Sequence, residues 1–193
     1  MTELKIYKTH PDVNLPAFAT EEAACFDIAA SMLGKATYEG YNKTNSKFER
    51  KIGSDGAIAI MPGDRVMVPT GMILDIPKGY SVRLHPRSGP SLKLGLVLAN
   101  CEAVIDSDYF NELFLLIHNT SENKINVAHG ERLAQAELVE QIKYKITETK
   151  LKPEQRTNRI GGLGSTGVKD QITDAVTQQP EKRGRGRPKK DAA

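Results

Sequence analysis

The sequence predicts an all-β domain, folded as a barrel or a jelly-roll-like structure and followed by a C-terminal tail. Short stretches rich in Val, Ile and Leu recur along the chain, and Pro, Gly and Asp stand between them. Segments with helical spacing of apolar residues are scarce. A chain of 193 residues is long enough for one domain with a sizeable core and a tail. Short strands at this spacing are typical of β-barrels and jelly rolls.

The clearest strand signals lie in the middle of the chain. Residues 57–89 predict four strands separated by Pro-Gly-Asp, Pro-Thr-Gly and Pro-Lys-Gly turns. Residues 94–120 predict further strands with a hairpin tip around Asn100, and residues 125–142 predict a pair of strands around His129-Gly130-Glu131. Residues 131–150 also resemble a helix, but their Val, Ile and Thr favour a strand.

Two segments lack this pattern. Residues 34–56 are polar and show no periodicity, so we expect an inserted loop or a mobile hairpin, most simply a tolerated surface excursion. Residues 169–193 lack apolar periodicity and are expected to be disordered in isolation. The expected organisation is therefore a barrel domain over residues 1–157, a glycine-rich arm over residues 158–168 and the tail.

Composition excludes several classes of protein. No apolar run approaches the ~20 residues of a membrane span, and the N-terminal Met-Thr-Glu-Leu-Lys does not resemble a signal peptide. Cys25 and Cys101 are too few for a disulfide framework and match no metal spacing. Their apolar surroundings are typical of buried thiols rather than catalytic ones. We therefore expect a cytoplasmic protein.

The stretch "AVIDSDYF" carries the first candidate chemistry. It places Asp106 and Asp108 after an apolar strand, with Tyr109 beside them. In an extended chain residues two apart share a face, so both carboxylates would point into one cavity, where one could orient a water as a general base. The alternative for this octapeptide alone is a solvated turn.

Further motifs carry groups that bind phosphate. "HPRSGPS" combines the guanidinium fork of Arg87, the hydroxyl of Ser88 and the backbone N–H of Gly89. "GERLAQ" contributes Arg132 and Gln135. "NRIGGLGSTG" is a glycine-rich loop near the C-terminus, but it lacks the Lys-Ser/Thr that ends a Walker A loop. Each motif alone is compatible with a simple turn.

Taken in order, the motifs resemble those of the trimeric dUTPases, which are deoxyuridine triphosphate nucleotidohydrolases. The five matching stretches are "ACFDIAAS" (24–31), "PRSG" (86–89), "NCEAVIDSDY" (100–109), "GERLAQ" (130–135) and "GGLGSTG" (161–167). The resemblance spans roughly residues 3–168. It implies a jelly-roll-like β-barrel that forms a homotrimer, with each active site built from three subunits. It also implies Mg²⁺-assisted hydrolysis of dUTP to dUMP and pyrophosphate, which lowers dUTP and supplies dUMP for dTTP synthesis.

The resemblance also assigns roles to residues. Asp106 matches the catalytic aspartate, which orients the water that attacks the α-phosphorus. Tyr109 matches the tyrosine that packs against the deoxyribose, Asn100 the residue that reads uracil, and Asp27 the aspartate that holds a water on magnesium. The implied phosphate contacts are Arg87, Ser88, Gly89 and Gln135, and the implied nucleotide contacts of the arm are Arg159, Leu163, Gly164, Ser165 and Thr166. Arg132 is expected to form a structural ion pair.

The chain departs from the family pattern at several positions. Leu163 stands where phenylalanine is usual, and Arg159 lies one residue after the expected arginine position, which Asn158 occupies. Phe110-Asn111 replaces Arg or Gln followed by Gly, and Pro90 replaces an aliphatic residue. These differences concern the arm and the turns that border the site.

Two alternative functions remain open. A dCTP deaminase shares this fold, but its catalytic glutamate would fall at Leu116. The other alternative is a dUTPase-like protein with weak catalysis that acts as a DNA-binding or regulatory module. Pyrophosphate release from dUTP, with dCTP and dTTP as controls, separates these alternatives.

The tail carries a separate motif. Residues 181–190 contain six basic residues and one acidic residue, whereas the rest of the chain has 21 basic and 23 acidic residues. Within them, Arg185-Gly186-Arg187-Pro188 is the core of an AT-hook, which places arginines in the narrow minor groove of A·T-rich DNA. The alternative is a basic tail that binds DNA without sequence preference. Either would place the protein on the nucleoid, as suits a viral or phage enzyme.

Overall fold

The computed structural model of the chain describes residues 2–158 and 161. It divides the chain into one compact unit, Met1–Tyr144, and a second unit, Lys145–Ala193. Within the described part of the chain, every element lies in the first unit, and α1 (Ser88–Leu94) is its one helix. The described residues of the second unit, 145–158 and 161, contain no helix or strand.

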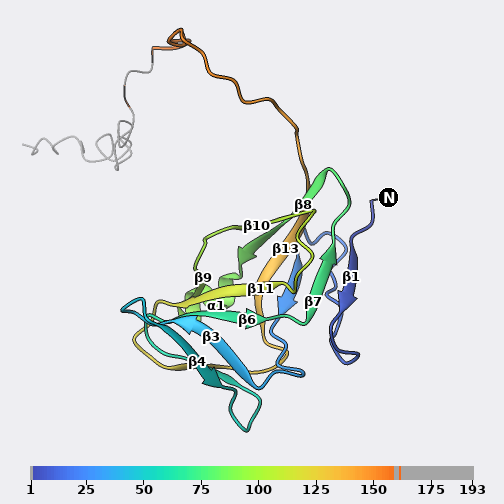
Figure 1. Cartoon of the computed structure of the whole chain (residues 1–193), viewed down its shortest axis with the longest axis vertical. Helices are drawn as coiled ribbons and strands as arrows, with labels where there is room; N and C mark the ends of the chain where they lie inside the picture. Colours follow the sequence, from blue (N-terminus) through green and yellow to red (C-terminus); the bar gives the residue numbers. More distant parts are fainter. Residues whose placement is uncertain (1, 159–160, 162–193) are drawn as a thin grey trace, which may run out of the picture. The chain divides into compact units, whose positions relative to one another are not determined.

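The strands form two larger and two smaller antiparallel sheets (Figure 1). The four-stranded sheet has the order β10 (Ala103–Asp106), β8 (Tyr80–Pro86), β13 (Arg132–Glu140), β2 (Phe26–Ala29). The five-stranded sheet has the order β4 (Lys47–Lys51), β3 (Thr37–Tyr41), β6 (Arg65–Pro69), β11 (Phe114–Asn119), β9 (Leu96–Leu98). The pairs are β1 (Lys5–Lys8) with β7 (Met72–Asp75) and β12 (Ile125–Val127) with β5 (Ile58–Ile60). The predicted all-β fold is confirmed.

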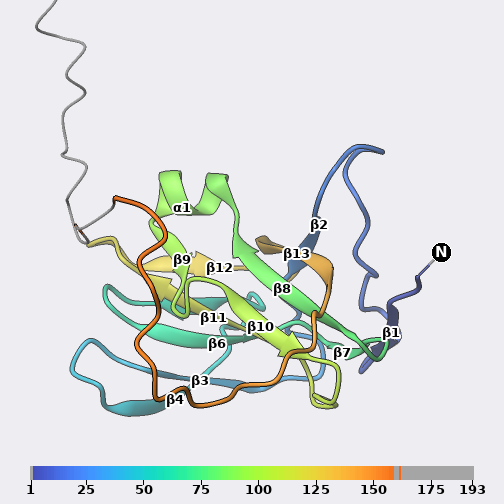
Figure 2. The same cartoon turned by 90° about the horizontal axis from the view of Figure 1, so that it is seen from above.

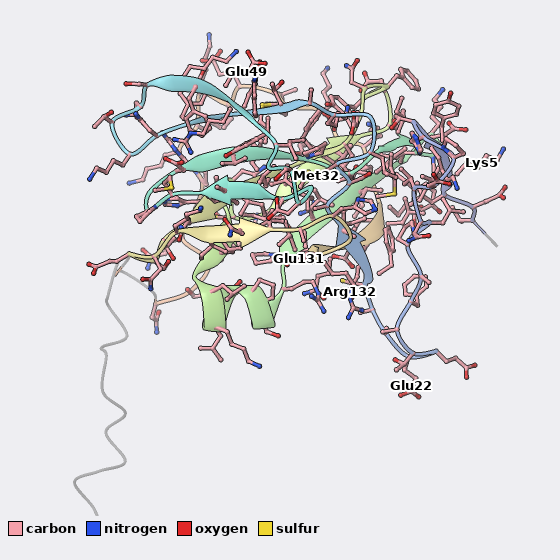
Figure 3. All side chains as sticks on the ribbon, turned by 90° about the horizontal axis from the view of Figure 1, so that it is seen from below. Lys5, Glu22, Met32, Glu49, Glu131 and Arg132 are labelled. Atoms are coloured by element: carbon pink, nitrogen blue, oxygen red, sulfur yellow. The ribbon has the colours of Figure 1, made fainter. Side chains whose placement is uncertain are left out.

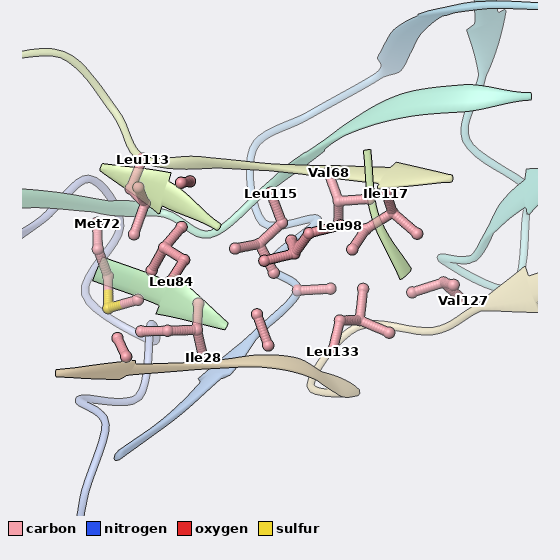
Figure 4. Close-up of a cluster of buried hydrophobic side chains, with 14 of the residues drawn as sticks. Ile28, Val68, Met72, Leu84, Leu98, Leu113, Leu115, Ile117, Val127 and Leu133 are labelled. Atoms are coloured by element: carbon pink, nitrogen blue, oxygen red, sulfur yellow. The ribbon is translucent and has the colours of Figure 1, made fainter. Parts of the chain in front are cut away.

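The core lies between the two larger sheets, which face each other in Figure 2. Alternation along β8 decides which side chains enter it, because successive residues of a strand point to opposite faces. Leu84 is fully buried, whereas Arg83 and His85 beside it are only partly covered. Figure 4 shows Ile28 and Leu84 from one layer facing Leu115 from the other. Arg83 and His85 thereby lie on the outward face of the four-stranded sheet.

Residues 37–51 form a hairpin that is built into the five-stranded sheet. β3 pairs with β4 on one side and with β6 on the other. Tyr38 is 5% exposed and its hydroxyl donates to the Ala59 carbonyl oxygen at 2.7 Å. Arg50 forms a 2.6 Å ion pair with Asp64, which is 2% exposed. The segment is thus the hairpin of the two expected alternatives, but it belongs to the sheet and is not a surface excursion, because Tyr38 and Gly40 are buried while Thr37 is exposed.

Replacing Gly40 by alanine should disrupt this hairpin. Gly40 is buried on β3, and an added Cβ would lie 2.8 Å from Cζ of Phe48 and would also clash with the Arg65 carbonyl oxygen. Because overpacking of a filled core is destabilising, we expect Gly40→Ala to lower the free energy of unfolding by about 1–3 kcal/mol in urea titrations. Thr37→Ala, on the exposed face of the same strand, is the control. Equal stability of both variants would contradict the docked hairpin.

Two predicted hairpins are instead connections between sheets. The turn at Asn100 joins β9 to β10, but β9 pairs with β11 and β10 pairs with β8. Likewise the segment around Gly130 joins β12 to β13, which pair with other strands. The prediction that these neighbours pair with each other was wrong, since strands adjacent in sequence can belong to opposite layers of a barrel.

The helix α1 was not predicted. The Ser-Gly-Pro sequence reads as a turn, yet Pro90 occupies the first helical turn, where its missing N–H removes no helical hydrogen bond. Arg87 is the N-cap, with an extended backbone. Gly95 ends the helix at φ 68°, and its N–H donates to the Pro90 carbonyl oxygen. The helix thus begins directly after Arg87.

Candidate functional site

Three of the predicted motifs meet on the outward face of the four-stranded sheet. Asp27 on β2 lies opposite Gln135 on β13, and Gln135 lies opposite His85 on β8. Strand β8 ends at Pro86, and Arg87, two residues after His85, contacts Asp27 on the same face. Residues that are far apart in sequence are brought together by the order of the strands β8, β13 and β2.

Two arginines bind the Asp27 carboxylate. Nε of Arg87 lies 2.7 Å from Oδ1 of Asp27, and a guanidinium nitrogen of Arg132 donates to Oδ2 at 2.9 Å. Arg87 also donates to the backbone carbonyl oxygen of Arg132 at 2.8 Å. Figure 3 shows Arg132 beside β2. One carboxylate and two guanidinium groups give this cluster a net positive charge, which suits a polyanionic ligand.

Gln135 and the start of α1 border the cluster. Nε2 of Gln135 donates to the Pro86 carbonyl oxygen at 3.0 Å, which fixes the side chain beside Arg87. Ser88 and Gly89 are exposed in the first turn of α1, where backbone N–H groups have no partner within the helix. A cavity of about 290 Å³ lies next to Asp27 and Arg132 and is also lined by residues of the 13–17 segment.

The Asp106 region forms a second groove. It has a volume of about 280 Å³ and brings Asn100, Asp106 and Tyr109 together. Apolar side chains complete its lining: Met67, Ala103, Val104, Ile105, Leu113, Phe114 and Leu116. An apolar groove with a few polar groups is typical of a small-molecule site.

The Asp106 carboxylate is exposed at the end of β10, and it has no ion-pair or hydrogen-bond partner within residues 2–158. Asp108 does not line the groove. The expectation that both carboxylates share one cavity was wrong, because the strand ends at Asp106 and the chain turns, with Tyr109 N–H donating to the Asp106 carbonyl oxygen at 3.1 Å. Of these two carboxylates, that of Asp106 therefore lies in the groove.

The two groups of residues do not share a cavity within one chain. The groove beside Asp27 and the groove beside Asp106 have no lining residue in common. Within the described residues no three His, Cys, Asp or Glu side chains lie close enough to hold a metal ion.

The two cysteines differ from each other. Burial and, secondarily, the negative charge of Glu137 raise the pKa of the Cys25 thiol, so this thiol stays protonated near neutral pH. Cys101 is exposed in the turn after Asn100, at φ 61°. The expectation of burial was wrong for Cys101, because the turn carries it away from the apolar strand that precedes it.

The sequence did not single out Lys35 and Glu112, which lie together next to the loop after Asp106. Their side chains form a 2.5 Å ion pair that joins the start of the 34–56 segment to the loop after Asp106. No spacing in the sequence links two residues so far apart; the acidic residue three positions after Tyr109 was the available signal.

Several predicted site residues lie outside the described residues. These are Arg159, Leu163, Gly164, Ser165 and Thr166 of the arm and Arg185, Gly186, Arg187 and Pro188 of the tail.

No helix in the described part of the chain is long and apolar enough to cross a membrane.

Known proteins resemble this chain over most of its length. A family model described as dUTPase matches residues 51–167. The deoxyuridine 5'-triphosphate nucleotidohydrolase of Brucella melitensis is 37% identical over 156 residues, which cover 81% of this chain and 86% of that protein. The enzyme of the same name from a Hydrogenobaculum strain is 32% identical and covers 86% of this chain and 99% of its own.

Solved structures resemble the fold. The crystal structure of a dUTPase from Streptococcus mutans has a TM-score of 0.57 at 25% identity, covering 74% of this chain and 98% of that one. A mutant dUTPase of Staphylococcus bacteriophage 80alpha, solved with dUpNHpp, has a TM-score of 0.66 at 19% identity and covers 87% and 100% of the two chains. At that identity the second likeness concerns the fold alone.

Proposed function

The chain belongs to the dUTPase family, and we propose that it hydrolyses dUTP to dUMP and pyrophosphate. The observation that carries this proposal is the contrast between its two site carboxylates. Asp27 is neutralised by two arginines, whereas Asp106 is unpaired among the described residues and lies beside Asn100 and Tyr109. One carboxylate thus belongs to a cationic cluster suited to phosphate, and the other is free to accept a proton.

Asp106 acts as the general base. Its carboxylate accepts a proton from a water while the water oxygen attacks the α-phosphorus, and the bond from that phosphorus to the bridging oxygen of pyrophosphate breaks. Asn100 at the turn reads the uracil ring, and Tyr109 packs against the deoxyribose. The apolar lining around them excludes water from the nucleoside, and this strengthens the hydrogen bonds between the turn at Asn100 and uracil.

The cationic cluster binds the triphosphate. Arg87 still has guanidinium donors beyond those bound to Asp27 and Arg132, and Ser88, Gly89 and Gln135 offer a hydroxyl, a backbone N–H and an amide. The N–H groups of the first turn of α1 add partial positive charge. Together these donors stabilise the charge that develops on the leaving pyrophosphate.

Mg²⁺ fits beside Asp27 if the carboxylate holds it through a metal-bound water and not by direct coordination. Both carboxylate oxygens already accept a guanidinium N–H, but each keeps a second lone pair that can accept from a metal-bound water. The remaining ligands would be triphosphate oxygens and waters, as Mg²⁺ often has when it binds with nucleotides. The ion would supply positive charge that offsets the negative charge of the phosphates.

A homotrimer would unite the two grooves. The separate placement of Asp27 and Asp106 within one chain supports a site composed of neighbouring subunits. Ile142, Tyr144 and Ile146 are 85%, 80% and 85% exposed and alternate with polar residues in the sequence. Apolar residues at this spacing are typical of a strand that gains a partner. In the assembled site, the arm would close over the nucleotide through Arg159, Leu163, Gly164, Ser165 and Thr166.

A substrate panel tests the activity. Purified protein is assayed for pyrophosphate release from dUTP, dCTP and dTTP, with Mg²⁺ and with EDTA. We expect release from dUTP only, and only with Mg²⁺. Ammonia release from dCTP would instead indicate a deaminase, although Leu116, on β11, offers no carboxylate for that reaction. Absence of turnover with intact DNA binding would favour the regulatory module.

The tail would tether the enzyme to DNA through Arg185, Gly186, Arg187 and Pro188. We expect removal of residues 181–193 to abolish retention on A·T-rich duplex DNA at about 0.15 M salt, because this segment has six basic and two acidic residues, whereas the rest of the chain has 21 basic and 22 acidic residues. Filter binding with A·T-rich and G·C-rich duplexes measures this, and dUTP hydrolysis by the truncated chain serves as its control. Equal retention of both chains on DNA would overturn the tether.

A further inference from the structure

We propose that Glu112 and Lys35 are positioning residues that hold Tyr109 in place and thereby set the discrimination between deoxyribose and ribose. This inference rests on the proposed function and deepens it. It starts from the loop after Asp106, whose tip residues Phe110 and Asn111 are exposed and do not fix the tyrosine themselves.

Tyr109 is tied to Glu112. The phenolic hydroxyl donates to the backbone carbonyl oxygen of Glu112 at 3.1 Å, so the position of this carbonyl sets where the ring lies. Tyr109 as a whole residue is 39% exposed in the single chain, and its hydroxyl makes no other hydrogen bond within the described residues. Movement of Glu112 would therefore move the wall of the groove that faces the sugar.

Glu112 is held by two further groups. One carboxylate oxygen accepts the Gly71 N–H at 2.9 Å, and the other lies 2.5 Å from Nζ of Lys35. The Glu112 side chain is 12% exposed and that of Lys35 is 31% exposed. A carboxylate this buried is costly to leave without its cation, so removing Lys35 would draw Glu112 toward solvent and shift the loop.

The neighbouring backbone limits the movement to this loop. Leu113 N–H donates to the Met72 carbonyl oxygen at 2.8 Å, and Thr70 donates to the Leu113 carbonyl oxygen at 2.7 Å. The Leu113 N–H shares a peptide plane with the Glu112 carbonyl, so its bond restrains that carbonyl from the β11 side. The Lys35 ion pair and the Gly71 N–H restrain Glu112 from its side-chain end, and the 34–56 segment supplies the cation.

The sugar is where such a shift matters. A tyrosine ring packed on the deoxyribose rejects a 2′-hydroxyl by contact, and displacement of about 1 Å is enough to change a rate by up to 10²-fold. A ring that is poorly held would admit the extra oxygen while still covering the deoxyribose. The expected signature is a lower ratio of kcat/KM for dUTP to that for UTP, because UTP turnover rises relative to dUTP.

The experiment compares Lys35→Met and Glu112→Gln with wild type on dUTP and UTP. We expect the dUTP/UTP ratio to fall about 10-fold in each variant, with no further fall in the double variant because both changes break one interaction. Lys35→Arg should restore the ratio. Lys47→Met is the matched control, because it removes an exposed 2.9 Å ion pair with Glu39 from the same 34–56 segment and should leave the ratio unchanged.

The outcomes separate this inference from the proposed function. Equal loss of activity on both substrates, or a lower Tm with an unchanged ratio, would show a purely structural pair and overturn it. Failure of the wild-type chain to hydrolyse dUTP would overturn the proposed function instead. In that case calorimetric binding of dUpNHpp and its ribonucleotide counterpart gives the ratio without turnover, and an unchanged binding ratio in the variants would overturn the positioning role.

Discussion

Replacing Asp106 by asparagine is expected to lower kcat for dUTP by about 10²–10⁴-fold, because an amide cannot accept the proton of the attacking water. The change preserves the shape of a side chain that is exposed at the end of β10 and unpaired within the described residues. Neither folding nor the cationic cluster depends on this carboxylate. Nucleotide affinity should therefore stay within about twofold, as expected for a group that acts only in the transition state.

Pyrophosphate release measures the loss of kcat, and calorimetry with dUpNHpp measures affinity. Asp108→Asn is the matched control: it makes the same chemical change two residues away, at an exposed position that does not line the groove. We expect the control to keep nearly full activity. Near wild-type turnover by Asp106→Asn, or equal losses in the two variants, would show that another group activates the water.

The fold was predictable where the alternation of side chains agreed with the turns. The run from Ile58 to Pro86 contains Pro- and Gly-bearing turns that separate β5, β6, β7 and β8 as expected. Strand pairing was less predictable, since β9 and β10 follow each other in sequence but lie in different sheets. Pairing is decided by which apolar faces meet across the core, and no local pattern specifies that choice.

The 34–56 segment shows why polar sequence misleads. Its strand β3 alternates buried Tyr38 and Gly40 with exposed residues, and the glycine conceals the inward face because it has no side chain. A close approach of the Phe48 ring requires that glycine. Composition therefore indicated a surface loop or a mobile hairpin, whereas the structure has a hairpin whose two strands belong to a sheet.

The candidate site was predictable as a set of residues but not as an arrangement. Asp27, Arg87 and Gln135 were expected to act near phosphate, and the register of β2, β13 and β8 brings them together. The ion pair expected for Arg132 is present, but its partner Asp27 and the second ion pair from Arg87 were not expected, because the resemblance assigned Asp27 a metal-bound water and Arg87 a phosphate. Electrostatic partners depend on distances between strands, which a linear sequence does not contain.

Mixing two inactive variants should restore activity if the proposed site is shared between subunits. Asp27→Ala removes the carboxylate of the cationic cluster, and Asp106→Asn removes the base in the other groove. Each homotrimer should be inactive, because every one of its sites lacks one group. When the two chains are unfolded together and refolded at equal amounts, random assembly gives sites in which one neighbour supplies Asp27 and the other supplies Asp106.

For a site that draws these two groups from different subunits, roughly a quarter of the sites in randomly mixed trimers are intact, so about 25% of wild-type kcat should return. The separately refolded variants, combined only after assembly, are the control and should stay inactive. Activity that remains absent after co-refolding, with mixed trimers demonstrated by mass spectrometry of differently tagged chains, would place both carboxylates in the same subunit's site. The two grooves, which share no lining residue within one chain, would then have to be bridged within that chain.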